Sequence, residues 1–234
     1  MAERSVMMID VDKTAYNDYL IFSVINQEAE DGLIEKTSVQ PINEALDKYK
    51  QGEIGYEEMV ETVVSRWASA LAGRYVSDVL NHTADFLIAN RQNFHPYVSK
   101  VIQMVANTHC VYFVTAEPQF VAQPIAKMFG ATSIIASEFE VEDGKFTGKA
   151  TKILSGREHK LEAITHLFEI HTKSGSIAFG DSEGDIEMLS AVENPICINP
   201  NEGLEKVRAE EGWLSSCGSD DTIEQVADLL NKNI

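Results

Sequence analysis

Short runs of apolar residues, each separated from the next by helical periodicity, are the feature of this chain that most limits its fold. The runs are continuous rather than alternating, which is typical of parallel strands covered on both faces. Helical periodicity fills residues 120–130 and 159–171, and Gly130 is placed to end the first of these helices. This alternation predicts an α/β domain with a parallel sheet. The strand candidates are residues 5–10, 110–115, 132–137, 176–181 and 195–199.

Two segments interrupt the alternation. Residues 139–148 contain two β-like runs around Asp143-Gly144, which predicts a hairpin. Residues 15–95 are rich in helix formers, poor in strand signals and too long for a simple crossover, so they predict a helical insert. His95-Pro96 marks the predicted return, because a residue before proline tends to leave helical geometry. We therefore expect a core of residues 1–14 and 96–234 and a helical cap of residues 15–95.

Composition narrows the class of protein. The net charge of −18 argues against a nucleic-acid partner, because phosphate backbones need basic surfaces. It does not exclude a small phosphorylated metabolite, since a bound cation can reverse the local field. The sequence has no apolar run long enough for a membrane span, no secretory pattern at its start and only three scattered cysteines. These features favour a reducing, cytoplasmic setting without a membrane partner, and the oligomeric state is unknown.

Polar residues cluster where the predicted strands end. Asp10 closes the first run and Asp12 follows in its loop, Thr115 closes the second, and Asp181 and Asp185 follow the fourth. In an open parallel sheet, ligands bind beyond the carboxyl ends of the strands. These side chains are therefore expected to meet at one edge of the sheet.

The residue types at this edge suit a phosphoryl group and a hard cation. Crowded carboxylates repel one another unless a divalent ion neutralises them, and Mg²⁺ prefers oxygen ligands of this kind. One carboxylate can then attack phosphorus, while a second handles the proton of the leaving oxygen. Lys160, near the start of the helix before the fourth run, can direct an ammonium group toward the same edge.

The order "DVDKT … FVT … K … GDSEGD" resembles the haloacid dehalogenase superfamily of phosphohydrolases. The helical insert after the first motif is similar to that superfamily's first cap class, as in its phosphoserine phosphatase-like branch. Residues 115–148 also resemble the stretch after the second motif in that branch. The resemblance implies a Rossmann-like parallel sheet core, a helical cap inserted after the first strand, and a magnesium-dependent phosphatase acting through an aspartyl-phosphate.

The resemblance also implies a role for each motif residue. A cap of this class closes over the site, with hinges expected near residues 14–18 and 93–97. The implied roles are nucleophile and magnesium ligand for Asp10, general acid/base with its main-chain carbonyl on the metal for Asp12, phosphoryl binding for Thr115 and Lys160, magnesium ligand for Asp181, and support of the metal's water shell for Asp185 and Ser182.

Plainer interpretations stand beside these roles. Taken alone, Thr115 is a strand-end hydroxyl that bonds the backbone, Lys160 is a solvated helix residue, and Ser182 is a helix cap. A signalling receiver domain also uses aspartates, threonine and lysine around magnesium, but the late "GDSEGD" and the long insert argue against it. The sequence is also compatible with a phosphomutase or phosphotransferase of the same superfamily and with a non-catalytic phosphate-binding protein.

The substrate is left open by the sequence. Phosphoserine phosphatases of this branch carry a glutamate early in the cap and Ser-Gly-Gly in the second motif, whereas this chain has "TAYNDYL" and "TAEP". Asp18 is a candidate replacement for that glutamate, and Lys13 stands where many relatives have glycine. Arg66 and Arg74 in the cap have a charge that suits an anionic substrate, but an exposed or ion-paired role is the expected one. Phosphoserine, amino-alcohol phosphates and other metabolite phosphates all stay candidates.

Overall fold

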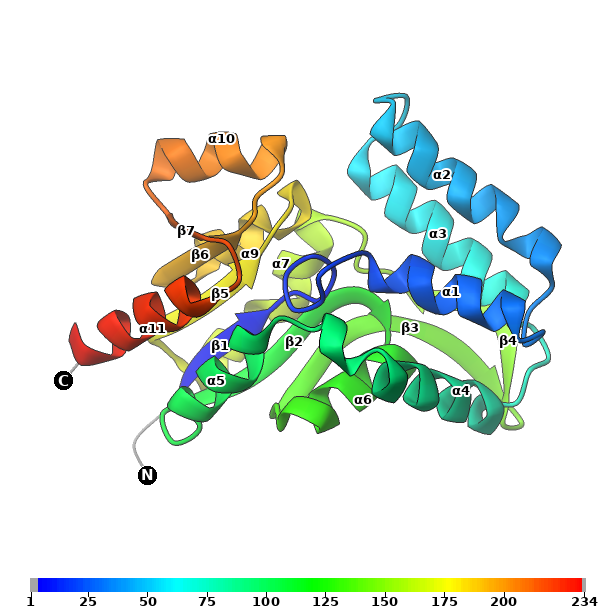
Figure 1. Cartoon of the computed structure of the whole chain (residues 1–234), viewed down its shortest axis with the longest axis horizontal. Helices are drawn as coiled ribbons and strands as arrows, with labels where there is room; N and C mark the ends of the chain where they lie inside the picture. The colour runs from blue at the N-terminus through cyan, green and yellow to red at the C-terminus, as the bar shows by residue number, and fades with distance from the viewer. Residues whose placement is uncertain (1–3, 233–234) are drawn as a thin grey trace.

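The structure of the protein is a computed structural model that describes residues 4–232. A seven-stranded sheet with the order β4-β3-β2-β1-β5-β6-β7 runs through its centre (Figure 1). All neighbouring strands are parallel except β3 and β4, which form an antiparallel pair. The strands are β1 (Ser5–Ile9), β2 (His109–Pro118), β3 (Ser133–Glu142), β4 (Lys145–Lys152), β5 (Thr172–Gly180), β6 (Asn194–Ile198) and β7 (Leu214–Ser216).

Both faces of the sheet are covered, as continuous apolar strands require. In β1, Met7 and Ile9 enter one hydrophobic core, and Val6 and Met8 enter the other, because successive side chains point to opposite faces. Helices cover both faces of the sheet, so all five residues of β1 are buried. This arrangement confirms the predicted α/β fold with a parallel sheet.

The helices divide between the two faces. The first face is covered by α5, α6 and α11, and the second by α7, α8, α9 and α10. Three further segments are short 3₁₀ turns, of which η3 (Glu183–Asp185) matters for the site. The helices are α1 (Leu20–Glu30), α2 (Gln40–Lys50), α3 (Tyr56–Ala70), α4 (Val76–Ala89), α5 (Pro96–Val105), α6 (Gln119–Phe129), α7 (Arg157–Thr165), α8 (Leu167–Ile170), α9 (Ile186–Ala191), α10 (Glu202–Glu211) and α11 (Asp220–Lys232).

Helices α1–α4 occupy the stretch of chain between β1 and α5, where the sequence predicts a helical insert. Figure 1 shows α2 and α3 side by side at one end of the sheet, with α1 and α4 nearer to α6. The insert is also tied to the β3–β4 hairpin through main-chain hydrogen bonds. Gly73 N–H donates to Phe146 O at 2.8 Å, and Phe146 N–H donates to Arg74 O at 3.0 Å. The α3–α4 turn therefore lies along the free edge of β4.

The two segments that lead into and out of the insert are paired with each other. Asn17 N–H donates to Asn93 O, and His95 N–H donates to Ala15 O, both at 2.9 Å. The rings of Tyr16 and Phe94 pack edge to face with centroids 5.0 Å apart. We call this pairing of residues 15–17 with residues 93–95 the linker ribbon.

Three predicted details can be compared with the structure. The Asp143-Gly144 hairpin is confirmed, and both residues have the positive φ (50° and 74°) that its two-residue turn requires. Thr115 does not end its strand, because β2 continues through Pro118. Strand β7 was not predicted, since Leu214-Ser215-Ser216 contains no apolar run.

No helix within residues 4–232 combines the length and the apolar character that a membrane span requires.

Candidate active site

The carboxyl edge of the three central strands gathers the predicted polar residues. Asp10 follows β1 and Asp181 follows β5, its direct neighbour. Thr115 lies in β2, on the other side of β1. Because parallel strands end at the same edge, the sheet itself brings together residues far apart in the sequence.

Lys160 supplies a positive charge beneath this edge. Its Nζ lies 2.7 Å from Asp10 Oδ1 and 2.6 Å from Asp185 Oδ1, and its side chain is only 2% exposed. Burial alone would lower the pKa of Lys160, but the two carboxylates beside it raise that pKa well above its usual value. Lys160 is therefore a charged, buried link between the first and last motifs, not a solvated helix residue.

Asp185 is fixed in place by the backbone around it. Its Oδ2 accepts hydrogen bonds from Asp181 N–H at 3.1 Å and from the N–H and hydroxyl of Ser182, each at 3.2 Å. Gly180 makes this possible, since a Cβ there would lie 2.5 Å from the Cβ of Asp185. The predicted helix-capping role of Ser182 is present as well, in a capping box with Asp185.

Three carboxylates form a buried cluster with the geometry of a metal site. Asp10, Asp181 and Asp185 each place one oxygen within 4.8 Å of the others. Burial and the Asp185 carboxylate raise the pKa of Asp10 to about 8 although Lys160 opposes the shift, and burial raises the pKa of Asp181 well above its usual value. The single positive charge of Lys160 does not balance these three carboxylates. Their oxygen atoms form a donor set that fits Mg²⁺.

Asp12 has a different environment from the other aspartates. Its Oδ1 accepts hydrogen bonds from Leu20 N–H and Ile21 N–H, at the N-terminus of α1. Burial nevertheless raises the pKa of Asp12 to about 6, because these two bonds only partly offset the loss of solvent. The side chain is thus held by the insert while its backbone belongs to the β1 loop, and it lines the cavity described below.

Thr115 is fully buried, and its Oγ1 accepts a hydrogen bond from Glu117 N–H at 3.1 Å. The next residue, Ala116, lines the cavity. Glu117 is completely buried and neither of its carboxylate oxygens has a hydrogen-bond partner among residues 4–232. Burial and the neighbouring Asp12 and Asp10 raise the pKa of Glu117 well above its usual value, which favours a neutral carboxyl group there.

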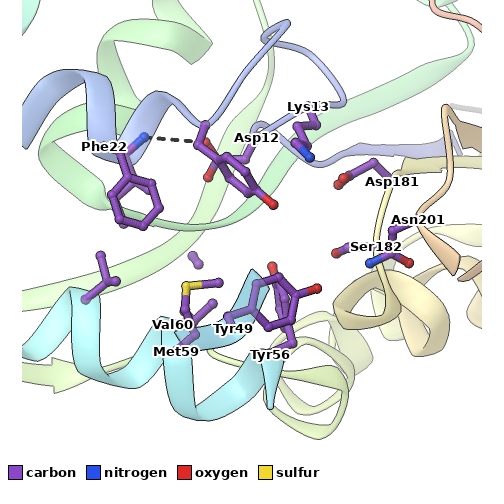
Figure 2. A pocket seen from close by; sticks show the side chains of 14 residues that line it. Asp12, Lys13, Phe22, Tyr49, Tyr56, Met59, Val60, Asp181, Ser182 and Asn201 are labelled. Carbon is purple, nitrogen blue, oxygen red and sulfur yellow. Dashed lines mark hydrogen bonds between the residues drawn. The ribbon is translucent and has the colours of Figure 1, made fainter. Parts of the chain in front are cut away.

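A cavity of about 60 Å³ opens between the core and the insert, and Asp12 and Asp181 are the aspartates in its lining (Figure 2). We divide its lining into two walls. The core wall consists of Asp12, Lys13, Ala116, Asp181, Ser182 and Asn201. The insert wall consists of Tyr19, Ile21, Phe22, Tyr49, Tyr56, Met59, Val60 and Val63.

The insert touches the core directly above the last motif. Tyr49 Oη donates to Glu183 Oε1 at 3.3 Å, and Asn201 Nδ2 donates to the other oxygen of Glu183. The Tyr56 ring lies against Gly184, where a Cβ would come within 2.5 Å of the ring. The end of α2 and the start of α3 are therefore seated on η3.

Several cap residues that the sequence singled out lie away from the cavity. Asp18 is exposed and accepts a hydrogen bond from the N–H of its neighbour Tyr19 at 2.8 Å, and it is not part of the cavity lining. Arg66 and Arg74 are exposed and line two other surface hollows. The aromatic residues of the insert wall were not predicted. The one hint in the sequence is the pair Tyr49 and Tyr56, which flank the turn at residues 51–55. Their spacing does not predict that this turn packs on the core.

Comparisons with known proteins identify the family and the fold. A family model described as haloacid dehalogenase-like hydrolase matches residues 8–190. A histidinol-phosphatase of Neisseria meningitidis is 26% identical over half of this chain and 58% of its own length. A phosphoserine phosphatase of Mycobacterium tuberculosis is 33% identical over 44% of this chain and 34% of its own length. The matches thus span from about a third to somewhat over half of these relatives.

A solved structure with the same fold comes from Bordetella pertussis, and its protein is described as having unknown function. It covers 93% of this chain and all of its own, with a TM-score of 0.77 and 24% identity. The fold is therefore shared over nearly the whole length, including the insert.

Proposed function

Because this chain belongs to the haloacid dehalogenase-like hydrolase family, we propose that it is a magnesium-dependent phosphatase that hydrolyses a small phosphomonoester through an aspartyl-phosphate. One observation carries the proposal. Asp10, Lys160 and Asp185 form a buried charged triad at the sheet edge, with Asp181 beside them and the cavity above. Relatives named as phosphatases support the same reaction class.

In the first step, the Asp10 carboxylate attacks phosphorus and the bond from phosphorus to the leaving oxygen breaks. Asp12 gives its proton to that oxygen, so the alcohol leaves neutral. In the second step, Asp12 takes a proton from water as the water attacks phosphorus, and the bond from phosphorus to Asp10 breaks. Phosphate is released and both carboxyl groups return to their starting states.

Magnesium, when bound to Asp10, Asp181 and the Asp12 carbonyl, supplies positive charge that offsets the carboxylates and the phosphoryl oxygens. Lys160 holds the Asp10 carboxylate at a fixed position and orientation, and its ammonium faces the phosphoryl oxygens once Asp10 is phosphorylated. The Thr115 hydroxyl proton is a further donor for these oxygens, since its Oγ1 only accepts from the backbone. Asp185 fixes Lys160 and the Asp181 loop, with Ser182 as its partner.

Substrate entry requires the two walls to separate, because a cavity of about 60 Å³ is smaller than typical ligand sites of roughly 300–1,000 Å³. We propose that the linker ribbon is one hinge for this motion. The bonds between the α3–α4 turn and β4 form a second attachment, so the α2–α3 end swings while the rest of the insert stays packed.

The test is phosphate release from a panel that includes p-nitrophenyl phosphate, phosphoserine and histidinol phosphate, with magnesium and with chelator. We expect magnesium-dependent release by the wild type and a loss of at least about 10⁴-fold in Asp10→Asn. Asp143→Asn is the matched control, because this exposed turn residue has a φ that asparagine also adopts.

Full activity in Asp10→Asn would contradict the aspartyl-phosphate. Transfer of the phosphoryl group to an added alcohol in preference to water would favour a phosphotransferase or mutase instead. Binding without any turnover would favour a non-catalytic phosphate-binding protein.

A further inference from the structure

The two walls of the cavity differ in the charge that they offer to a leaving group. The reacting phosphorus must lie over the core wall, next to Asp10, so the alcohol part of the ester faces the insert wall. Figure 2 shows Phe22 on one side of the space and Tyr49 and Tyr56 on the other, with Met59 and Val60 between them. The leaving group is therefore enclosed by aromatic and apolar side chains.

None of the described insert side chains that line the cavity carries a positive charge for a carboxylate on the leaving group. Among residues 4–232, Lys13 is the one basic side chain that lines the cavity. Arg66 and Arg74 belong to other hollows, and Lys160 is already bonded to Asp10 and Asp185. A carboxylate desolvated between these rings without a cation would be costly to bury.

Lys13 belongs to the core wall and its ammonium lies 4.4 Å from the centroid of the Tyr19 ring. In that position it stands beside the acidic loop that carries Asp181, where the phosphoryl dianion arrives. Its position also shows that an ammonium group is accommodated against an aromatic face of this cavity.

The four rings of the insert wall are arranged as two edge-to-face pairs. Tyr19 and Phe22 have centroids 5.8 Å apart, and Tyr49 and Tyr56 have centroids 5.9 Å apart. Aromatic faces attract cations, most strongly when the cation is desolvated. The Glu183 carboxylate, which accepts from the Tyr49 hydroxyl, adds negative charge behind this pair.

We propose that the cavity selects a phosphomonoester whose leaving alcohol carries a protonated or quaternary nitrogen and no carboxylate. The inference rests on the proposed function for the position of the phosphoryl group, and it separates amino-alcohol phosphates from phosphoserine. The recognition comes from the faces of Phe22, Tyr49 and Tyr56 together with the surrounding negative charge, instead of from an ion pair.

The proposal can be tested with three esters, each of which differs from the next by one group. Ethyl phosphate lacks the nitrogen, phosphoethanolamine carries it, and phosphoserine adds a carboxylate. Their dissociation constants are measured by calorimetry with magnesium on Asp10→Asn, which cannot turn them over, and kcat/KM is measured on the wild type. We expect phosphoethanolamine to bind about tenfold more tightly than either of the others.

A matched pair of variants isolates the ring. Tyr49→Phe and Tyr49→Leu both lose the hydroxyl bond to Glu183, but only leucine loses the aromatic face. We expect the leucine variant to lose at least about threefold in affinity for phosphoethanolamine relative to ethyl phosphate, and the phenylalanine variant to keep the wild-type ratio.

Equal binding of ethyl phosphate and phosphoethanolamine would overturn the inference, as would equal losses for both esters in Tyr49→Leu. Tighter binding of phosphoserine that disappears in Lys13→Met would overturn it too, and would assign Lys13 to a carboxylate. Selective binding of phosphoethanolamine without turnover by the wild type would support the inference while refuting the proposed phosphatase.

Discussion

The core side and the insert side of the cavity are held in place by different kinds of interaction. On the core side, buried charges are held at short range by specific partners, as in Lys160 between Asp10 and Asp185. On the insert side, aromatic rings pack by shape, and Tyr49 reaches the core through a single hydrogen bond to Glu183. A charged site tolerates little displacement, whereas packed rings can be exchanged for others of similar volume. In the proposed function, the charged residues on the core side carry out the reaction and the insert wall selects the ester.

Among variants that keep Asp10, this contrast predicts the largest effect for Lys160→Met. The substitution leaves two carboxylates buried against each other, so we expect kcat/KM to fall about 10³-fold and the free energy of unfolding to fall by about 3 kcal/mol. Phosphate release and urea unfolding measure the two effects. Lys149→Met is the control, since Lys149 is exposed and pairs with Glu140 at 3.3 Å on the surface. Similar losses in both variants would show that the buried triad contributes no more than a surface ion pair.

Removal of magnesium is expected to have the next largest effect. Chelation should lower turnover by at least about 100-fold, and added magnesium should raise the midpoint of thermal unfolding by a few degrees. Asp181→Asn should lose this thermal shift. The exposed group Glu57, Glu61 and His159 also brings its ligand atoms together, so Glu57→Gln is the matched control. A shift that vanished in Glu57→Gln and persisted in Asp181→Asn would move the metal site to the surface.

Gly184→Ala tests the contact between the walls. A Cβ at this position meets the Tyr56 ring at 2.5 Å, so the insert must move away from η3. We expect kcat/KM to fall about tenfold, because a small displacement of positioning groups weakens turnover without removing any reacting group. Gly55→Ala is the control, since a Cβ there meets no atom within 4 Å. Unchanged kinetics in Gly184→Ala would mean that the seating of Tyr56 does not position the substrate.

The smallest effect on turnover is expected for Glu28→Gln, which changes the pH dependence of stability instead. Glu28 is buried in α1 and accepts a hydrogen bond from Trp67 Nε1 at 2.6 Å, and burial raises its pKa from 4.5 to about 8. The folded protein keeps this proton up to about pH 8, whereas the unfolded chain loses it near pH 4.5. Stability from this group is therefore complete below pH 4.5 and declines toward pH 8, by about 1 kcal/mol per pH unit.

Urea unfolding at pH 5, 6.5 and 8, followed by tryptophan fluorescence, measures this decline. Glu28→Gln should flatten it, and Glu30→Gln, an exposed residue of the same helix, should leave it unchanged. A decline of equal slope in Glu28→Gln would assign the pH dependence to other groups, of which the buried Glu117 is the first candidate.

The sequence was sufficient for most of the charged residues at the sheet edge because backbone topology alone brings them together. Asp10 and Asp181 each follow a strand of the sheet, and parallel strands end at one edge whatever the loops do. Lys160 was recognisable only through the resemblance, since its contacts with Asp10 and Asp185 join positions far apart in the sequence. The placement of Thr115 at a strand end was wrong, because β2 continues for three residues with the same buried character.

The residues of the insert wall could not be predicted in the same way. Asp18, Arg66 and Arg74 have charges that suit a substrate contact, but all three are exposed and lie outside the cavity lining. Which face of a helix points inward depends on packing across the α2–α3 pair and on its seating over Gly184, and neither has a local sequence signal. The bond between Glu28 and Trp67 was missed for the same reason.

The linker ribbon has a consequence for how the chain folds. Strand β1 pairs with β2 about 100 residues later, as in Met7 with Val111, and closing so long a loop slows folding. Within the insert, α2 packs on α3 and α1 packs on α4, and the ribbon sets residue 17 beside residue 93. We expect early collapse of the insert to shorten the loop that the central sheet must close. The segment that we propose to select the substrate would in that case also deliver the second strand to the first.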